Sequence, residues 1–425
     1  MTRRMKNTFE GWCFYESAFD PNTGNTVRTY EVPDGRHGHI LNNHPRYGAD
    51  EGCPLPHPWE LGISKEERDK RLAAVRAWRD DNPNIRDRWS NLVPGRSRWN
   101  RSHAYSPVPE LIDVKINEEC SFGCPNCYMD SKKGDKGFAP LSMFEVIFDG
   151  LDDAPYQIAL GGGEPCEHPQ LPEILEFIRS KGTVPSYTTA GYKFRPEVIA
   201  ATNRYCGGVA LTYHRHTKLS AFKKTYLKWK KALAPHVQLN IHLIADHGCA
   251  QAMTELVASL REEKIPANKI SIVLLGYIPI GRGKLDSIMG KKEYNEELPK
   301  VLQRLLDQGI RLSFSEPLLP YFLSRPWLEI GQEFMDKQEG IVSCYVDNYG
   351  NVNRSSFSEW HPKKSNIYEV RFQDIWDAPT WLSYTPEGQP CSTCKEVSKC
   401  APANNLLMHI CEYQHHNVKE RATNG

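Results

Sequence analysis

Strand-like and helix-like segments alternate from residue 109 to about residue 314, and this pattern constrains the fold more than any other feature of the sequence. Apolar or β-branched runs predict strands at 111–116, 158–160, 185–189, 208–213, 237–245, 270–278 and 311–314. Helical patterns lie between them, at 142–150, 170–181, 196–201, 218–233, 250–263 and 291–308. Such alternation requires right-handed crossovers and a parallel sheet. Six or so repeats predict an α/β fold, a partial (β/α)6 TIM-like barrel with its chemistry at the C-terminal ends of the strands.

The segments on either side of this barrel have a different character. Residues 1–107 are rich in Pro, Gly, His, Trp and Asn, which predicts an irregular N-terminal extension with one helix at 64–79 and a possible role in substrate binding. The barrel is expected to span 108–320. Residues 321–425 predict a small C-terminal α+β domain, with a hairpin around Asn348, Gly350 and Asn351, a short strand and helix, and a cysteine-rich tail.

Composition restricts the partners and the compartment. The chain has 53 Lys and Arg residues against 52 Asp and Glu residues, so neither nucleic acid nor an anionic membrane is expected as an obligatory partner. The N-terminus lacks the apolar region of a signal peptide, and no apolar run approaches the ~20 residues of a membrane span. Thirteen cysteines in such a chain predict a reducing, cytoplasmic location where thiols serve metals or chemistry.

Three cysteines follow the first predicted strand closely, in the stretch "EECSFGCPNCYMD". Cys120, Cys124 and Cys127 lie four and three residues apart. A c-type haem site needs histidine after the last cysteine, where Tyr128 stands. A structural zinc site needs a fourth ligand nearby. The favoured interpretation is an iron–sulfur cluster with one iron left open for an exogenous ligand, while zinc and a chance grouping remain alternatives.

The C-x3-C-x2-C arrangement of these residues, directly after the first strand of a βα repeat, resembles the signature of the radical S-adenosylmethionine (SAM) enzymes. In that family, the open iron of a [4Fe-4S] cluster binds SAM. One electron then cleaves SAM to a 5′-deoxyadenosyl radical, which abstracts a substrate hydrogen. The resemblance implies a [4Fe-4S] cluster and SAM as cofactors, and an electron donor such as flavodoxin or ferredoxin as a partner.

Further segments at the predicted strand ends resemble the SAM contacts of this family. "GGGEP" follows the second strand, where glycines allow close backbone approach and a carboxylate suits the SAM ammonium group. "TTAG" follows the third strand, and "YIPIGRG" the sixth. One departure is Asn126, which stands where the family often has an aromatic residue. The cofactor-binding candidates are Gly161, Gly162, Gly163, Glu164, Tyr128, Thr188, Thr189 and Ile280.

A second group of cysteines lies near the C-terminus, and its residues alone allow zinc or an iron–sulfur cluster. Its C-x2-C-x5-C spacing downstream of a barrel resembles the SPASM/twitch extension of radical SAM enzymes, which binds auxiliary [4Fe-4S] clusters. The full pattern uses seven cysteines for two clusters, but Ser355 and Asn404 occupy two of those positions here. The resemblance therefore implies one auxiliary [4Fe-4S] cluster, held by Cys391, Cys394, Cys400 and Cys411.

Cys344 corresponds to the first position of that extension and is left without a cluster. It is a candidate catalytic hydrogen-atom donor, although a single cysteine is more commonly a small buried hydrophobe.

The resemblance implies a radical SAM enzyme of the SPASM/twitch group that modifies a ribosomally made peptide by crosslinking, epimerisation or backbone excision. One alternative is a radical SAM dehydrogenase or mutase of a small molecule, such as a sugar or an antibiotic precursor. A remote alternative is a non-catalytic, zinc-stabilised binding protein.

Overall fold

The computed structural model describes the central part of the chain and several segments on either side. In the N-terminal part it describes the backbone of four strands within residues 2–42. The other described residues are 108–134, 137–278, 280–290, 292–315, 318, 321, 343–357 and 365–377.

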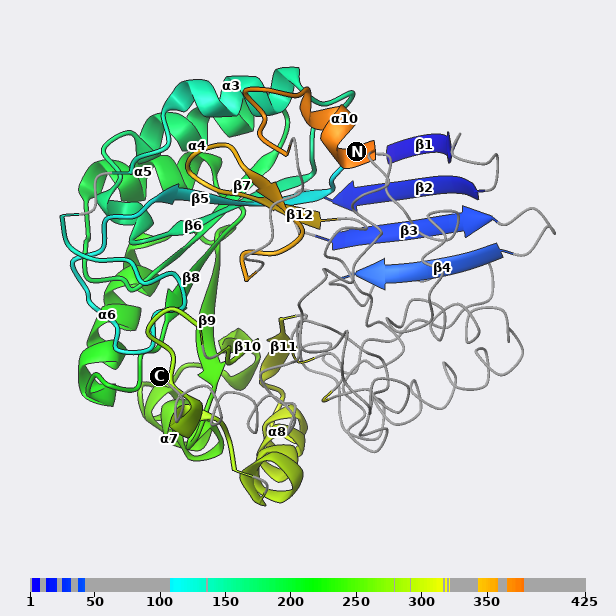
Figure 1. Cartoon of the computed structure of the whole chain (residues 1–425). Coiled ribbons are helices and arrows are strands. Elements are labelled where there is room, and N and C mark those ends of the chain that lie inside the picture. Colours follow the sequence, from blue (N-terminus) through cyan, green and yellow to red (C-terminus); the bar gives the residue numbers. More distant parts are fainter. Residues whose placement is uncertain are drawn as a thin grey trace, which may run out of the picture.

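The centre of the molecule is a curved sheet of nine strands (Figure 1). Seven of them are parallel neighbours in chain order. They are β5 (Leu111–Asn117), β6 (Gln157–Gly162), β7 (Val184–Thr189), β8 (Gly208–Thr212), β9 (Gln238–Ala245), β10 (Ser271–Gly276) and β11 (Arg311–Phe314). The sheet is not closed, because its edges are β11 on one side and β13 on the other. The predicted partial TIM-like barrel is confirmed.

Helices connect successive strands and cover the outer face of this sheet (Figure 1). They are α3 (Leu141–Asp149), α4 (Leu171–Ser180), α5 (Pro196–Tyr205), α6 (Leu219–Ala232), α7 (Cys249–Glu262) and α8 (Leu298–Asp307). Short helical turns are η1 (Pro165–Glu167), η2 (Ala267–Lys269), η3 (Leu285–Ser287) and η4 (Glu293–Glu297). The helix predicted at 291–308 therefore divides into the π-helical turn η4 and helix α8.

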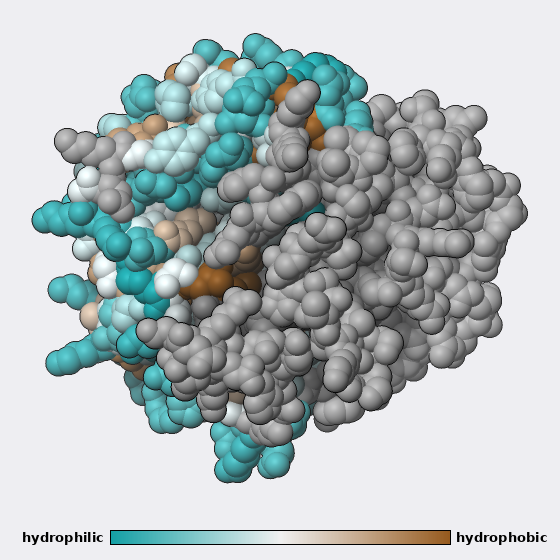
Figure 2. All heavy atoms as spheres, viewed as in Figure 1, coloured by the Kyte–Doolittle hydropathy of each residue, from teal (hydrophilic) through white to brown (hydrophobic). Residues whose placement is uncertain are grey.

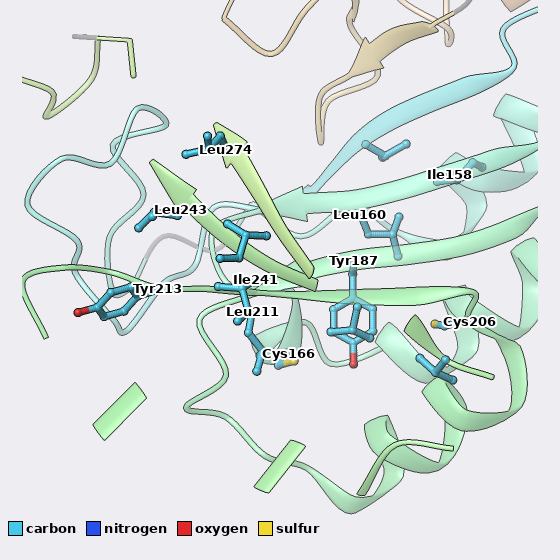
Figure 3. Packing of buried hydrophobic residues seen from close by; sticks show 14 of the residues in the cluster. Ile158, Leu160, Cys166, Tyr187, Cys206, Leu211, Tyr213, Ile241, Leu243 and Leu274 are labelled. Atoms are coloured by element: carbon cyan, nitrogen blue, oxygen red, sulfur yellow. The ribbon is translucent and has the colours of Figure 1, made fainter. Parts of the chain in front are cut away.

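The main core lies between the sheet and these helices. Every second strand residue, such as Leu160 and Leu211, is buried on the helix side (Figure 3). Helix α6 adds Tyr226 and Trp229, both fully buried. The Trp229 indole N–H donates to the Gly191 carbonyl at 2.9 Å, which anchors the helix to the loop after β7.

The opposite, inner face of the sheet is polar and is built from small side chains between a few charged ones. One row across neighbouring strands shows this composition, because the residues paired in register are Asp113, Ala159, Ser186 and Gly208. We call the following set the inner face: Asp113, Lys115, Ala159, Gly161, Ser186, Thr188, Ala210, Asn240 and His242.

The C-terminal part adds two strands to the same sheet. Strand β12 (Ser343–Val346) pairs in parallel with β5 and turns back into β13 (Val352–Asn353), so the predicted hairpin is confirmed. Gly350 lies in the turn with a φ of +85°, a backbone conformation that is strained for residues with a side chain. The predicted short helix is also present, as α10 (Phe372–Asp377). Because β12 joins β5, the sheet continues across the boundary expected at residue 320.

The prediction of an irregular N-terminal extension was wrong for four segments within residues 2–42, which form strands. A four-stranded antiparallel sheet is formed by β1 (Thr2–Asn7), β2 (Cys13–Asp20), β3 (Asn25–Glu31) and β4 (His37–Asn42). Its strands carry many polar residues, so the apolar alternation is weak. The turn-prone residues between the strands, such as Pro21 and Asn22, were the available signal. The predicted helix at 64–79 lies outside the described residues.

The visible described surface is largely polar (Figure 2). Of the large apolar side chains that the structure describes, Tyr349 and Tyr368 are exposed. No helix in the described parts of the chain combines the length and the apolar character that membrane crossing requires.

Candidate cluster and cofactor site

The three predicted cluster ligands lie together in the loop that follows β5. We call residues 118–132 the cysteine loop. The amide of Cys120 donates to the Lys132 carbonyl at 3.2 Å, and the amide of Asp130 donates to the Cys127 carbonyl at 3.2 Å, so the loop closes on itself. The thiols of Cys120, Cys124 and Cys127 are free and partly exposed.

The thiols are close enough to influence one another electrostatically. Burial, together with the neighbouring Cys127 and Cys120, raises the pKa of Cys124 to about 12. The pKa of Cys120 is also raised, mainly by burial. Because metals bind thiolates, loading this site must displace protons from these two thiols.

Arg282, from the loop after β10, fastens the cysteine loop. Its Nε donates to the Cys124 carbonyl at 2.9 Å. Its Nη1 donates to Asp130 Oδ1 at 2.8 Å and to the Ser131 carbonyl at 2.9 Å. The backbone amide of Arg282 donates to the Cys127 carbonyl at 2.9 Å. The guanidinium charge also lowers the pKa of Cys124, so it favours the thiolate.

Gly281 allows this close approach. Its φ is +58°, and a Cβ at this position would lie 2.4 Å from the Tyr128 carbonyl oxygen and 2.6 Å from that of Cys127. A side chain would therefore push the two loops apart. The β10 loop and the cysteine loop, which are more than 150 residues apart in sequence, form one unit.

The "GGGEP" segment at the end of β6 lies directly against the start of the cysteine loop. Gly163 donates its amide to the Asn117 carbonyl at 2.7 Å, and Glu164 donates its amide to the Glu119 carbonyl at 2.8 Å. A Cβ on Gly163 would lie 2.0 Å from the Glu119 oxygen. Gly161 differs, because a Cβ there would meet nothing within 4 Å.

The carboxylate of Glu164 is buried and faces the end of β7. Its Oε1 accepts hydrogen bonds from the Cys166 amide at 3.0 Å and the Thr189 hydroxyl at 2.5 Å, and its Oε2 accepts from the Ala190 amide at 2.8 Å. Burial raises its pKa despite these donors. Two predicted SAM-binding residues, Glu164 and Thr189, are therefore hydrogen-bonded to each other. Their contact with SAM stays a prediction.

The other predicted contacts surround the same loop. The Tyr128 hydroxyl donates to Ser356 at 3.5 Å, and its ring lies 4.8 Å from that of Phe357. Ile280 lies next to Gly281 in the β10 loop and closes a turn with Gly283, whose amide donates to the Ile280 carbonyl at 2.8 Å. Thr188 lies on the inner face, one residue before Thr189.

His214 is a neighbour of the cysteines that the sequence did not single out as a site residue. Its Nδ1 lies 3.4 Å from the Cys124 sulfur. Its ring packs 4.8 Å from Phe122, which stacks in turn on Tyr192 at 5.2 Å. Burial, with a contribution from His216, lowers the pKa of His214 to about 4, so the imidazole is neutral at pH 7.

Arg282 and His214 were therefore missed as site residues, although a signal existed. Each follows a predicted strand, and the C-terminal ends of parallel strands meet on one rim. Arg282 and His214 lie far from the cysteines in sequence, so the sequence alone could not show which polar residues on that rim contact them.

Cys344 lies in β12 in register with Ile112, and both side chains belong to the core on the helix side. The thiol is 1% exposed, and burial raises its pKa well above the usual value. Its neighbour Tyr345 pairs with Asp113 on the opposite face. This placement does not favour the predicted role of Cys344 as a hydrogen donor to a substrate.

The donor set at the cysteine loop fits a thiolate-bound cluster. Three thiols lie at one strand end, and the Arg282 cation adjoins them to offset negative charge. Among the residues that the structure describes, no three Cys, His, Asp or Glu side chains are grouped as a single metal ion would require. That finding concerns one ion, whereas a [4Fe-4S] cluster distributes its cysteines over different irons. Cys391, Cys394, Cys400 and Cys411 lie outside the described residues.

Comparison with known proteins yields distant relatives. No family model matches the chain. It is 21% identical over 295 residues to the antilisterial bacteriocin subtilosin biosynthesis protein AlbA of Bacillus subtilis, a match covering 66% of this chain and 63% of AlbA. It is 27% identical over 115 residues to the mycofactocin maturase MftC of Mycobacterium tuberculosis, covering 23% of this chain and 29% of MftC. The chain thus spans less than two thirds of either relative.

Solved structures share the fold. SuiB of Streptococcus suis, bound to the precursor peptide SuiA, matches with a TM-score of 0.54 at 14% identity, over 80% of this chain and 76% of SuiB. SuiB bound to S-adenosylmethionine matches with a TM-score of 0.53 at 15% identity, over 80% and 79% of the two chains. SuiB thus shares the fold of this chain.

Proposed function

We propose that this chain is a radical SAM enzyme that modifies a ribosomally made peptide. The observation that carries the proposal is the group of three thiols at the end of β5, held by Arg282 and adjoining the glycine-rich end of β6. Cys120, Cys124 and Cys127 would hold a [4Fe-4S] cluster with one iron open to SAM. When bound, this pair supplies a 5′-deoxyadenosyl radical that removes a hydrogen atom from the substrate.

The residues around the thiols would prepare this site. Arg282 would keep the cysteine loop in shape and offset the charge of its thiolates. Neutral His214 can donate one ring N–H towards the Cys124 sulfur, and hydrogen bonds to cluster sulfurs tune reduction potentials. Gly161 leaves open space at the end of β6, which suits a ligand close to the backbone.

A peptide substrate is supported by the relatives. SuiB is described with its precursor peptide, AlbA as a bacteriocin biosynthesis protein and MftC as a maturase. We further propose one auxiliary [4Fe-4S] cluster on Cys391, Cys394, Cys400 and Cys411. It would accept or relay electrons, and a flavodoxin or ferredoxin would supply them from outside.

The test is anaerobic purification followed by assay with SAM and dithionite. Two clusters predict about eight irons per chain and the formation of 5′-deoxyadenosine. Replacing Cys120, Cys124 and Cys127 together by Ala should remove about four irons and abolish SAM cleavage. Replacing Cys391, Cys394, Cys400 and Cys411 should remove the other four. A colourless protein that contains zinc and neither iron nor sulfide would contradict the proposal.

A further inference from the structure

Asp113 is an acidic group on the inner face that the proposed cluster chemistry does not use. It lies in the middle of β5 between Ile112 and Val114, which point into the core on the helix side. Because side chains alternate along a strand, Asp113 points to the inner face. Its side chain is exposed to solvent, and partial desolvation by the surrounding chain nevertheless raises its pKa to about 6.

No described residue neutralises this carboxylate. Within the described parts of the chain, no side chain or amide donates a hydrogen bond to Asp113 or forms an ion pair with it. The nearest cation along the strand, Lys115, is already paired with Glu118 at 2.9 Å. The Asp113 charge contributes to the raised pKa values of Tyr128, Tyr345 and Cys344, so these groups lie near it.

Those three groups cannot supply a positive charge. Burial raises the pKa of Tyr128, Tyr345 and Cys344, so all three are neutral at pH 7. With a pKa of about 6, Asp113 is mostly ionised at pH 7. An ionised carboxylate that water can reach on this face can form a charge-assisted hydrogen bond with a cationic ligand.

The row that contains Asp113 has room for a long side chain. Its register partners across the sheet are Ala159, Ser186 and Gly208, which all have small side chains. Strands lie about 4.8 Å apart, so this row of small residues extends about 14 Å from Asp113. The next row towards the cysteine loop contains Lys115 and Gly161, so the acidic group lies on the same face as the proposed SAM site.

We propose that Asp113 binds a cationic side chain of the substrate, so that the peptide carries a lysine or arginine next to the residue that is modified. This inference rests on the proposed peptide substrate. An ammonium or guanidinium group would form a charge-assisted hydrogen bond with the carboxylate, while its aliphatic stem would lie over Ala159 and Gly208.

The experiment measures binding without turnover. Reconstituted full-length protein is titrated anaerobically at pH 7.5 with the peptides acetyl-Gly-Lys-Gly-amide and acetyl-Gly-norleucine-Gly-amide, and binding is followed by ligand-observed NMR. The two peptides differ in charge but share the aliphatic stem. Wild type should prefer the lysine peptide by about tenfold or more, the value of one hydrogen bond between charged groups.

Variants of Asp113 and a matched control test whether this residue causes the preference for the lysine peptide. Asp113→Asn keeps the shape, removes the charge and should abolish the preference for lysine, while Asp113→Glu should retain part of it. The control is Asp149→Asn, which changes an exposed carboxylate at the end of α3 and should keep the full preference. Equal binding of the two peptides by wild type, binding of neither, or a preference that survives in Asp113→Asn would overturn the inference.

The outcome is separable from that of the proposed function. Peptide binding requires neither reductant nor turnover, whereas the proposed function is tested by SAM cleavage in wild type. Loss of SAM cleavage with an intact lysine preference would refute the radical chemistry alone. SAM cleavage without a lysine preference would refute the role of Asp113 alone.

Discussion

At the scale of single residues, the cysteine loop depends on a side chain that lies outside it. The Arg282 side chain donates hydrogen bonds to two carbonyls and one carboxylate of the loop. The neighbouring Gly281 has no side chain, so the two loops can come close together. The planar fork of Arg282 suits several acceptors at once, which a lysine ammonium would not match. The ligand loop of the proposed cluster is thus held in place by a residue from the loop that follows the sixth strand of the barrel.

Arg282→Ala should therefore lower cluster loading. The variant loses three side-chain hydrogen bonds, and a hydrogen bond to a charged group contributes about 1.5–3 kcal/mol. After reconstitution, we expect iron to fall from about eight towards about four per chain, because the auxiliary cluster is untouched. Iron analysis and the electron paramagnetic resonance signal of the reduced protein measure this change.

Arg371→Ala is the matched control, because Arg371 pairs with Asp152 at 2.6 Å and both side chains are about half exposed. Such surface pairs contribute about 0–1 kcal/mol, so iron loading should stay unchanged. Full loading of Arg282→Ala would mean that the cysteine loop keeps its shape unaided.

At the scale of elements, the three glycines at the end of β6 have different tasks. Gly162 and Gly163 approach the backbone of the β5 end and the cysteine loop, whereas Gly161 points into open space on the inner face. The motif therefore combines two positions that pack strand ends together with one that leaves room for a ligand.

Gly163→Ala and Gly161→Ala should separate these tasks. The first places a Cβ 2.0 Å from a backbone oxygen, and overpacking of about 1–3 kcal/mol should lower Tm by roughly 3–10 °C. The second meets nothing within 4 Å and should leave Tm unchanged while weakening SAM binding. Thermal melts and equilibrium dialysis with SAM check both expectations. Equal loss of stability in the two variants would contradict this division.

The sequence predicted the elements of the barrel well because each strand buries alternate apolar residues against helices. It missed β1–β4, whose strands are polar, and it could not show which strand ends touch. The contact between Arg282 and Cys124 joins residues 158 positions apart, so it exists only after the sheet curves. The same is true of the hydrogen bonds between Glu164 and the β7 end, because they depend on the register of two strands.

At the scale of the whole molecule, the curved sheet has a hydrophobic outer face under its helices and a polar inner face. Asp113 and His242 both lie on that inner face. In sequence they are single polar residues within strand-like runs, and their common orientation follows only from the register and the curvature of the sheet. Burial lowers the pKa of His242 to about 4 and raises that of Asp113 to about 6.

The raised pKa of Asp113 predicts a pH-dependent stability difference between wild type and Asp113→Asn. The folded-state pKa of about 6 exceeds the value of 3.8 for the unfolded chain, so the folded state binds the proton more tightly. Wild type therefore loses stability as pH rises from about 4 to about 6, and the loss is complete above that range. Asparagine does not titrate, so Tm of the variant minus Tm of wild type should grow over this range. Above that range, the difference in Tm should level off at roughly 1–4 °C. The difference is small because solvent around Asp113 weakens the electrostatic contribution to stability.

Thermal melts of both proteins between pH 4.5 and pH 7.5 measure this difference. His242 titrates in the opposite sense, and its contribution is lost as pH falls from 6.5 through about 4, but it is present in both proteins and cancels. A flat or falling difference for Asp113→Asn would mean that a group outside the described residues already neutralises Asp113. The inner face would then lack the unsatisfied charge on which recognition of a cationic substrate depends.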